Sequence, residues 1–532
     1  MKKTILSAIL ISSAGIMAAQ ESYSPELYND LQILKMSADG SFVAGEGIVG
    51  YNDYGGGELW PKNGPVVISL KTGETLKYDG FNLGKGNCLA NTGVAVGNMT
   101  NKTTYATEPA LLIEGEGVIP ADLQKKGFYM CFLTAISSDG TMVCGYYQNP
   151  NQPFYFTITD GEPGEIIPLP CPEKDLLGDT PQCVSAEWMS ADGRVIAGEV
   201  TSGNGGYTYP IVYTFDGDEW SYSFPALGLF NSEIVIPEKP GDGPSNPEWN
   251  FEYYMGEEKM KEYFDALNKG ENPNPLDYMD DAQRREEYLT AMAEYTQWEE
   301  EYSKYEEAVE KVLSSSVNFS ADYCLSNDGK YLVITSLSDT SGEFTRAGEG
   351  DKYFYLFNIE DSSYISVNPG ISGLHPTSIV KDGTVIAVTS DGYRSFILES
   401  GEENFVNAID YIADLNSDYA QWINDNLEME INVGSFFNPN MQKMVVTGNV
   451  VADESFNIFG GSWMDPDTYA YTSYLFSIED ENANVELPVT NQGEGYKVYD
   501  LHGVKIMETG DAEMLKTLRK GVYIINGKKI MR

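Results

Sequence analysis

Histidine and paired carboxylates are the side chains of this sequence that could carry acid–base chemistry, and histidine is scarce. His375 and His502 are the only two histidines, whereas Asp and Glu together number 80. A Ser-His-Asp triad needs a histidine that reaches both partners, and a histidine-rich metal site needs several. We therefore expect neither a histidine-dependent triad nor a multi-histidine metal site, and we interpret His375, which precedes Pro376, as structural.

Two carboxylates alone can catalyse glycoside hydrolysis, but with so many acids the sequence does not single out a pair. Several aspartates recur within one motif, and Asp in such a turn bonds its own backbone. We attribute this recurrence to turn chemistry rather than to catalysis; the aspartates are Asp39, Asp139, Asp192, Asp328 and Asp382. The sequence shows no calcium loop, nucleophile elbow or phosphate loop, so we expect no metal and no cofactor.

The motif that contains these aspartates is a short phrase, Ser-x-Asp-Gly between two apolar runs, which predicts a β-hairpin. Glycine takes the positive-φ position of the turn without steric cost. The turn glycines are Gly40, Gly93, Gly140, Gly193, Gly329 and Gly383. We assign a seventh, weaker copy to residues 436–448, where Asn440 and Met441 replace the Asp-Gly pair.

The copies recur about every 50 residues, apart from one long gap, which is typical of a β-propeller. A second strand pair follows each hairpin, so each repeat supplies the four strands of one blade. We therefore predict an all-β, seven-bladed β-propeller over residues 20–487. A β-solenoid or two β-sandwiches are the alternatives. The phrase resembles the repeats of WD40-like bacterial propellers, a resemblance that implies a fold but not a function.

Two insertions interrupt the blades. Residues 234–316, between blades four and five, predict a Pro-rich linker and then helices over 256–267 and 281–313. The second helix has an apolar stripe that we interpret as internal packing, with a docking surface for another protein as the alternative. Residues 405–427, after blade six, predict one or two short helices.

Loops on the face that carries these insertions are rich in aromatic, glycine and amide residues, a composition that suits stacking on sugar rings. The alternative is that they are ordinary turns with packing aromatics. The candidate ligand-binding residues are Tyr51, Tyr54, Trp60, Tyr146, Tyr147, Tyr207 and Trp463.

The two ends of the chain predict export. Residues 1–19 have the basic start, apolar centre and small-residue end of a cleavable signal peptide, which leaves no transmembrane anchor. The last residues, 488–532, predict a small β-sandwich-like tail that resembles the C-terminal sorting domain of type IX secretion. The matching positions are Tyr499, Asp500, Gly503, Gly521, Tyr523, Gly527 and Lys529. The resemblance implies contact with the type IX machinery and a location outside a Gram-negative cell, secreted or on the outer-membrane surface.

Six cysteines in an exported chain permit disulfides. Cys171 and Cys183 flank a loop and are the best-placed pair for a bridge. The others, Cys88, Cys131, Cys144 and Cys324, read as core residues or lie outside any metal-binding spacing.

A formal net charge of −46 disfavours nucleic-acid binding. Together these features predict a secreted or cell-surface propeller that binds a glycan or an extracellular protein without catalysis. A carbohydrate-active enzyme, a hydrolase or lyase with a carboxylate pair on the propeller face, is the alternative.

Overall fold

The computed structural model covers most of the chain between residues 26 and 531. The described residues are 26–53, 59–101, 103–120, 122–123, 130–148, 151–203, 207–317, 319–336, 353–371, 373–432, 441–464, 471–477, 496–499, 505–509, 522–525 and 528–531. The predicted signal peptide and Tyr54 lie outside these ranges, as do Asp500, Gly503, Gly521 and Gly527 of the tail.

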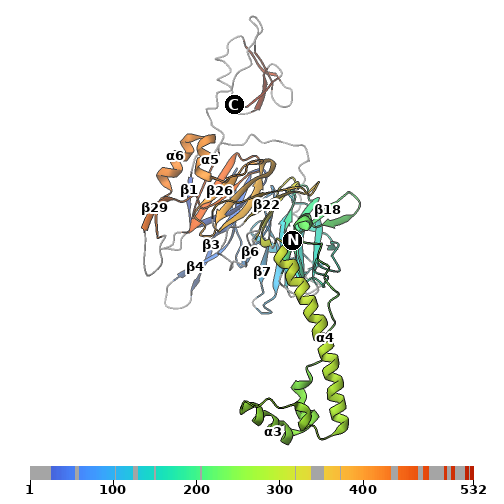
Figure 1. Cartoon of the computed structure of the whole chain (residues 1–532). Coiled ribbons are helices and arrows are strands. Elements are labelled where there is room, and N and C mark those ends of the chain that lie inside the picture. The colour runs from blue at the N-terminus through green and yellow to red at the C-terminus, as the bar shows by residue number, and fades with distance from the viewer. Residues whose placement is uncertain are drawn as a thin grey trace, which may run out of the picture.

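The chain is mostly β, with few helices (Figure 1), and most neighbouring strands pair antiparallel, although β8 and β10 form a parallel pair that joins two of the groups below into one sheet. The first sheets are β2 (Leu31–Met36), β3 (Phe42–Asp53), β4 (Leu59–Ser69) and β5 (Thr75–Lys77), then β6 (Phe81–Leu83), β7 (Ala95–Thr100), β8 (Thr107–Ile113) and β9 (Glu116–Val118). The next group is β10 (Met130–Ile136), β11 (Met142–Gln148) and β12 (Gln152–Thr159), with β13 (Glu162–Pro163) and β14 (Ile167–Pro168) on β12. The fourth is β15 (Cys183–Val184) and β16 (Trp188–Met189), both on β17 (Val195–Thr201), then β18 (Thr208–Phe215) and β19 (Trp220–Ser223).

The second half of the chain repeats this pattern. It contains β20 (Phe319–Leu325), β21 (Tyr331–Ser336), β22 (Phe354–Asn358) and β23 (Tyr364–Val367), then β24 (Leu374–Val380), β25 (Thr384–Thr389), β26 (Ser395–Leu398) and β27 (Val406–Asn407). The last such sheet is β30 (Asn449–Ala452), β31 (Ile458–Met464), β32 (Tyr471–Ser477) and β1 (Glu26–Asn29).

The sheets follow one another in a closed circle, which is the architecture of a β-propeller. The first strands of successive sheets lie beside one another, with β16 next to β20, β20 next to β24 and β24 next to β30. Strand β30 in turn contacts β2 of the first sheet. The N-terminal strand β1 pairs with β32 and so completes the last sheet. The circle is therefore closed by pairing the first described strand, β1, with β32 of the last sheet.

The hairpin turns behave as the repeated phrase predicts. In the first, Ser37 Oγ donates to Asp39 Oδ1 at 2.9 Å, and the Phe42 N–H donates back to Ser37 Oγ at 2.9 Å. The same Ser–Asp bond, 2.6 to 2.7 Å long, recurs at Asp139, Asp192 and Asp328. All six turn glycines have a positive φ, between 69° and 100°. Local turn bonding thus accounts for Asp39, Asp139, Asp192 and Asp328, as predicted, whereas Asp382 lies in a different turn and itself has a positive φ of 58°.

Hydrogen bonds also pass from one turn to the next, and we call this chain of bonds the turn ring. It runs from Glu454 N–H to Ala38 O (2.9 Å), Asp39 N–H to Asn91 Oδ1 (3.2 Å), Asn91 N–H to Ser138 O (2.8 Å), Ser138 N–H to Ala191 O (2.9 Å), Ala191 N–H to Asn327 O (2.6 Å) and Asn327 Nδ2 to Glu454 Oε2 (2.7 Å). These bonds join six turns and bypass the turn at Lys381–Gly383. The turns therefore converge at one end of the ring.

The seventh copy of the phrase is not where the sequence analysis put it. Met441–Val445 forms β29, which pairs with β28 (Glu428–Asn432) in a separate two-stranded sheet. The last inner hairpin is instead β30–β31, and Phe456 takes the positive-φ position there, with φ 58°. The prediction was wrong because this turn contains no glycine to mark it.

Most of the helical residues lie between β19 and β20. They form 3₁₀ helices η1 (Pro225–Leu229), η2 (Pro247–Asn250) and η3 (Pro275–Tyr278), and helices α2 (Phe251–Met255), α3 (Glu257–Asn268) and α4 (Ala282–Ser315). Figure 1 shows α4 extending away from the sheets, with α3 at its far end. The remaining helices are η4 (Lys381–Gly383), α5 (Ala408–Leu415) and α6 (Ser417–Asn426).

The two ends of α4 are anchored differently. At its C-terminal end Tyr305, Val309 and Val312 are buried in the large core cluster of the sheets. At its other end Tyr288 packs with Phe251 and residues from α3 and η3 in a small separate cluster, which we call the head. These buried members of the stripe serve internal packing. The C-terminal residues form a sheet in the order β34 (Lys505–Thr509), β33 (Tyr496–Tyr499), β35 (Val522–Ile525), β36 (Lys528–Met531).

The segment 84–87 crosses from the second sheet to the fourth. The Asn87 side chain bonds the backbone of Met189 through both its amide nitrogen and its oxygen. Gly86 donates its N–H to Thr134 O at 3.1 Å, and its α-carbon lies so near Glu187 that a β-carbon would overlap the Glu187 carbonyl oxygen. Glycine is required here because two backbones meet at the centre of the ring.

Replacing Gly86 with alanine should destabilise the ring by about 3 kcal/mol, because rigid backbone occupies the space that the methyl group needs. Gly50→Ala is the matched control, since a β-carbon there meets no atom within 4 Å. Urea denaturation of both variants measures the difference. Equal stability of the two variants would contradict the close approach.

Candidate functional site

Charged and aromatic side chains gather where residues 84–87 meet the fourth and fifth sheets, and we call this group the central cluster. Lys85 Nζ lies 2.5 Å from Glu187 Oε2, and Tyr323 Oη donates to the same oxygen at 2.7 Å. Lys85 Nζ also lies 5.2 Å from the centre of the Tyr323 ring. The Glu187 side chain is only 4% exposed, whereas that of Lys85 is 47% exposed. Solvent therefore reaches the ion pair from the lysine side.

The first strand of the ring adds a second cation. Lys35 of β2 donates from Nζ to the Lys85 carbonyl oxygen at 3.0 Å and lies 4.7 Å above the Trp188 ring. A cation over an indole face is favourable, and more so when it is partly desolvated. Lys35, Lys85, Glu187 and Tyr323 thus come from four different sheets, and only the closed ring brings them together.

A second carboxylate, Glu199 of β17, belongs to the same cluster. Its Oε2 is buried and makes no hydrogen bond with any described residue. Burial, together with the negative charge of Glu187, raises the pKa of Glu199 to about 7, although Lys85 opposes the shift. Burial lowers the pKa of Lys85, but attraction by Glu187 and Glu199 outweighs it, so the net shift is upward. Near neutral pH the cluster therefore holds a carboxyl group that can accept or release a proton.

A line of three polar side chains lies beside the cluster. His375 Nδ1 is 2.6 Å from Asp322 Oδ2, and His375 Nε2 is 2.9 Å from Ser390 Oγ. Asp322 also raises the pKa of Lys85 and of Glu199 through its charge, which places it near both. The expectation that no histidine-dependent triad occurs came from the number of histidines. The fold nevertheless brings Asp322 and Ser390, which are 53 and 15 positions away, to the two ring nitrogens of His375.

The candidate ligand-binding aromatics do not form one surface. Tyr51 and Trp60 are exposed, by 61% and 57%, while Tyr146 and Tyr147 are half-buried. Tyr207 and Trp463 are core residues: Tyr207 donates to Val317 O at 3.0 Å, and Trp463 packs against Tyr474. Neither of these two has a ring face open to a ligand. The sequence could not separate the two groups because all of them follow the same Gly-rich turns.

All six cysteines are reduced, including Cys171 and Cys183, so the predicted bridge is not formed. Burial raises the pKa of the Cys183 thiol to about 11. A thiol with such a pKa is mostly protonated at neutral pH and is a weak nucleophile.

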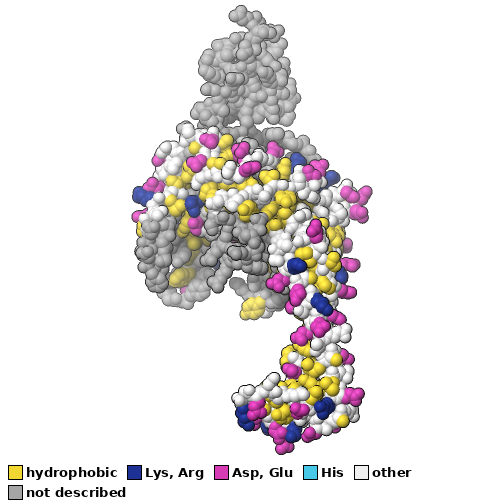
Figure 2. All heavy atoms as spheres, in the orientation of Figure 1, with side chains coloured by type: hydrophobic (Ala, Val, Ile, Leu, Met, Phe, Trp, Pro, Cys, Tyr) yellow, Lys and Arg dark blue, Asp and Glu magenta, His cyan; other side chains and the backbone are white. Residues whose placement is uncertain are grey.

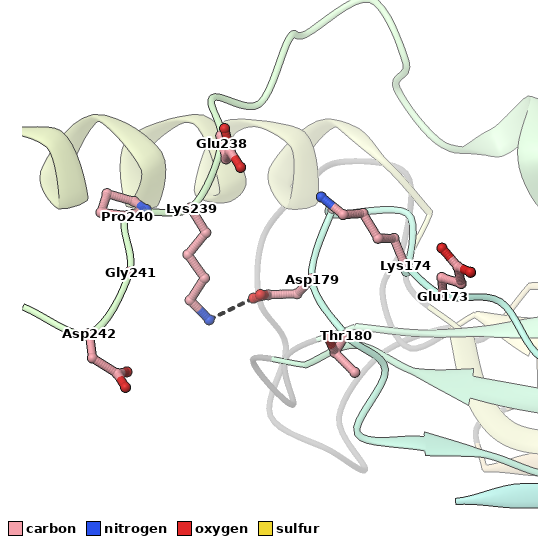
Figure 3. A pocket seen from close by; sticks show the side chains of 10 residues that line it. Glu173, Lys174, Asp179, Thr180, Glu238, Lys239, Pro240, Gly241 and Asp242 are labelled. Carbon is pink, nitrogen blue, oxygen red and sulfur yellow. Dashed lines mark hydrogen bonds and ion pairs between the residues drawn. The ribbon is translucent and has the colours of Figure 1, made fainter.

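A polar groove of about 480 Å³ separates the loop before β15 from the linker that leads to α4 (Figure 3). Lys239 Nζ bonds Asp179 Oδ2 across it at 2.6 Å, and Tyr305 of α4 donates to the same carboxylate at 3.1 Å. Further along, Trp298 Nε1 donates to Gly241 O at 2.9 Å. These bonds fasten the linker and the base of α4 to the ring, so we assign the groove a structural role.

Metal and membrane signals are both absent from the described residues. No three His, Cys, Asp or Glu side chains among them are grouped as metal ligands. Across the same ranges, no helix combines the length and apolar character needed to cross a membrane.

Comparison with solved structures finds propellers that are similar to this chain at very low sequence identity. No family model and no curated protein matches it. The propeller domain of the trilobed protease from Pyrococcus furiosus is similar over 86% of this chain and 97% of its own, with 8% identity and a TM-score of 0.41. The Dos1 propeller covers 85% of this chain and 95% of its own, with 8% identity and a TM-score of 0.40. The Cps50 (Swd1) propeller domain of Myceliophteria thermophila covers 85% and 98%, with 9% identity and a TM-score of 0.38.

The raised pKa of Glu199 predicts a defined pH dependence of stability. The pKa of Glu199 in the folded protein, about 7, lies above the ordinary value of 4.5. The stability that the protonated carboxyl group contributes is therefore fully present below pH 4.5 and is lost as the pH rises through about 7. Glu199→Gln removes the titration, so the variant should gain stability relative to the wild type between pH 5 and pH 8. Urea denaturation midpoints of both proteins at pH 5 and pH 8 measure this gain. The same difference in midpoint at both pH values would contradict the raised pKa of Glu199.

Proposed function

We propose that this chain is an exported binding protein with a ring of seven blades. Each blade is one four-stranded unit; the first begins with β2, and β1 completes the last. Its binding surface performs no chemistry, and its partner is a glycan or an extracellular protein. The observation that carries the proposal is the exposed aromatic tip of the β3–β4 hairpin. The crowded centre supports it as well, because Glu187 is already occupied by Lys85 and Tyr323.

The β3–β4 hairpin is the longest in the ring, and its outer part carries large exposed side chains. Tyr51 pairs with Pro61 and Asn52 with Trp60 in the ladder. Successive residues of a strand point to opposite faces, so Leu59, which is 63% exposed, shares one face of the hairpin with Tyr51, whereas Trp60 lies on the other face with Asn52. Both faces of this tip therefore present large exposed apolar side chains, and such side chains grouped on a soluble surface mark contact sites. Flat aromatic rings beside amide and hydroxyl groups suit sugar rings and protein surfaces alike.

The enzyme alternative rests on one observation, the pKa of about 7 at Glu199 beside Glu187. A raised carboxyl pKa next to a second carboxylate is the pattern of a glycosidase acid and its partner. Both carboxylates come from the fourth sheet, however, and Glu187 is held by two protein partners. We therefore place binding first.

Export is the second part of the proposal. The basic and apolar start of residues 1–19 supports passage across the inner membrane, and the tail supports type IX secretion. Tyr499 lies in β33, Tyr523 in β35 and Lys529 in β36, so these motif positions belong to strands of one sheet. We infer that the tail contacts the secretion machinery, and that the protein ends at the outer-membrane surface or in the medium.

Trp60→Ala should weaken binding at least tenfold, because truncating an aromatic anchor commonly costs about 2 kcal/mol. The measurement is binding to an immobilised glycan array and to extracellular proteins. Trp249→Ala is the matched control, since Trp249 is 83% exposed but lies by the head of the α4 arm. If only Trp249→Ala lost binding, the binding site would lie near the head and not at the β3–β4 tip. Turnover of any glycan on the array would favour the carbohydrate-active enzyme.

Deleting residues 496–532 should leave the ring folded but trap it in the periplasm, because the sorting strands are then missing. Cell fractionation with surface proteolysis follows the protein. Unchanged surface display of the truncated chain would contradict the sorting proposal.

A further inference from the structure

The Asp322–His375–Ser390 line has the order and spacing of a nucleophile, a base and an orienting carboxylate. Ser390 Oγ lies 2.9 Å from His375 Nε2, and Asp322 Oδ2 lies 2.6 Å from His375 Nδ1. Both distances fall in the range that hydrogen-bonded proton transfer needs. Each ring nitrogen of His375 thus has one of the two oxygen atoms beside it.

Three separate elements hold these side chains. Asp322 is in β20, His375 is in β24, and Ser390 lies in the turn between β25 and β26. Because β20 and β24 are neighbouring inner strands, the aspartate and histidine are fixed by the sheets rather than by loops. Catalytic groups on rigid strands keep their mutual geometry better than groups on loops.

The serine is held by a backbone contact as well. The Ser390 N–H donates to Gly373 O at 2.8 Å, and the Ser390 hydroxyl donates to the same oxygen at 2.7 Å. The hydroxyl proton must therefore turn from Gly373 O to His375 Nε2 before the histidine can accept it. Gly373 has φ 69°, and a β-carbon on it would come within 2.5 Å of Ser390 Oγ. Glycine at 373 thus leaves room for the hydroxyl, which stays next to the histidine.

Exposure distinguishes this line from a buried structural tie. Ser390 is exposed, and the side chains of His375 and Asp322 are 31% and 39% exposed. A substrate can therefore reach the hydroxyl from solvent, whereas a tie between sheets gains most when water is excluded. The line ends on an accessible oxygen.

We propose that Ser390 is the nucleophile of a hydrolytic site for carboxylic esters. This activity goes beyond the proposed binding and uses none of its residues. His375 acts as the general base, and Asp322 is a positioning residue that fixes the imidazole and stabilises its protonated form.

The reaction balances with water as the only co-reactant. Ser390 Oγ bonds to the ester carbonyl carbon while its proton passes to His375 Nε2, and the carbonyl electrons move onto oxygen. When the carbonyl re-forms, the alkoxide leaves and takes the proton from His375. Water then attacks the acyl carbon and gives a proton to His375. When the bond from this carbon to Ser390 Oγ breaks, Ser390 Oγ takes that proton back and the carboxylic acid leaves.

The class of substrate follows from the donors available to the developing oxyanion. The N–H of Asp391, the residue after the nucleophile, donates no hydrogen bond within the described part of the chain. One backbone donor supplies part of an oxyanion hole, and each missing donor costs about 10² to 10³ in rate. Such a site suits esters, whose alkoxide leaves readily, better than amides.

The test uses the full chain, a fluorophosphonate probe and 4-nitrophenyl acetate. The probe should label Ser390, as peptide mass spectrometry can show, and Ser390→Ala should reduce both labelling and hydrolysis to background. Ser363→Ala is the matched control, because Ser363 is an exposed turn serine bonded to Asp361 at 2.6 Å. It should leave both rates unchanged.

The other two residues give a graded result. His375→Gln should slow labelling by about 10² to 10⁴-fold, the usual contribution of a general base. Asp322→Asn should lower kcat for the ester while KM stays within about twofold, which a purely structural role would not produce. Equal labelling of wild type and Ser390→Ala would overturn the proposal, as would wild-type rates in a folded His375→Gln variant.

Discussion

The close approach of backbones at the centre of the ring is the constraint on which the rest of this structure depends. The turn ring sets how near the first strands come to the axis, because each turn is bonded to its neighbour. Segment 84–87 then passes so close to Glu187 that only glycine, which has no β-carbon, fits at position 86. The buried polar groups at the centre therefore find partners mainly among one another, whereas Lys85 also reaches solvent and Glu199 Oε2 makes no hydrogen bond with any described residue.

That requirement explains the charges of the central cluster. The chain carries 80 acidic and 34 basic residues, yet two of its lysines lie together at the axis. Lys85 neutralises Glu187, which is nearly buried, and Lys35 supports Lys85 from the first sheet. Burial leaves other carboxyls partly protonated, because it raises the pKa of both Glu199 and Glu454 to about 7. Two proton-binding carboxyls thus occur in one ring, one in the central cluster and one in the turn ring.

Local chemistry predicted the parts of the fold that repeat, and it missed the parts that depend on distant contacts. The Ser-x-Asp-Gly turns form as expected because their bonds join residues two to five positions apart. The last inner hairpin was missed because Phe456 replaces glycine in the left-handed position. Tyr207 and Trp463 were predicted to be ligand-binding aromatics on the surface, but the packing of the sheets buries both. The pairing of His375 with Asp322 and Ser390 spans three elements, and no local pattern encodes it.

Strand β1 has a consequence for how this chain must mature. It pairs with β32, more than 440 positions further along, and forms the outer edge of the last sheet. A nascent chain therefore holds its first strand without a partner until almost the whole ring has been synthesised. During that interval the ring stays open, and its inner edges offer pairing sites to other chains. A holding factor that shields those edges would serve this protein until the final strand arrives and shuts the circle.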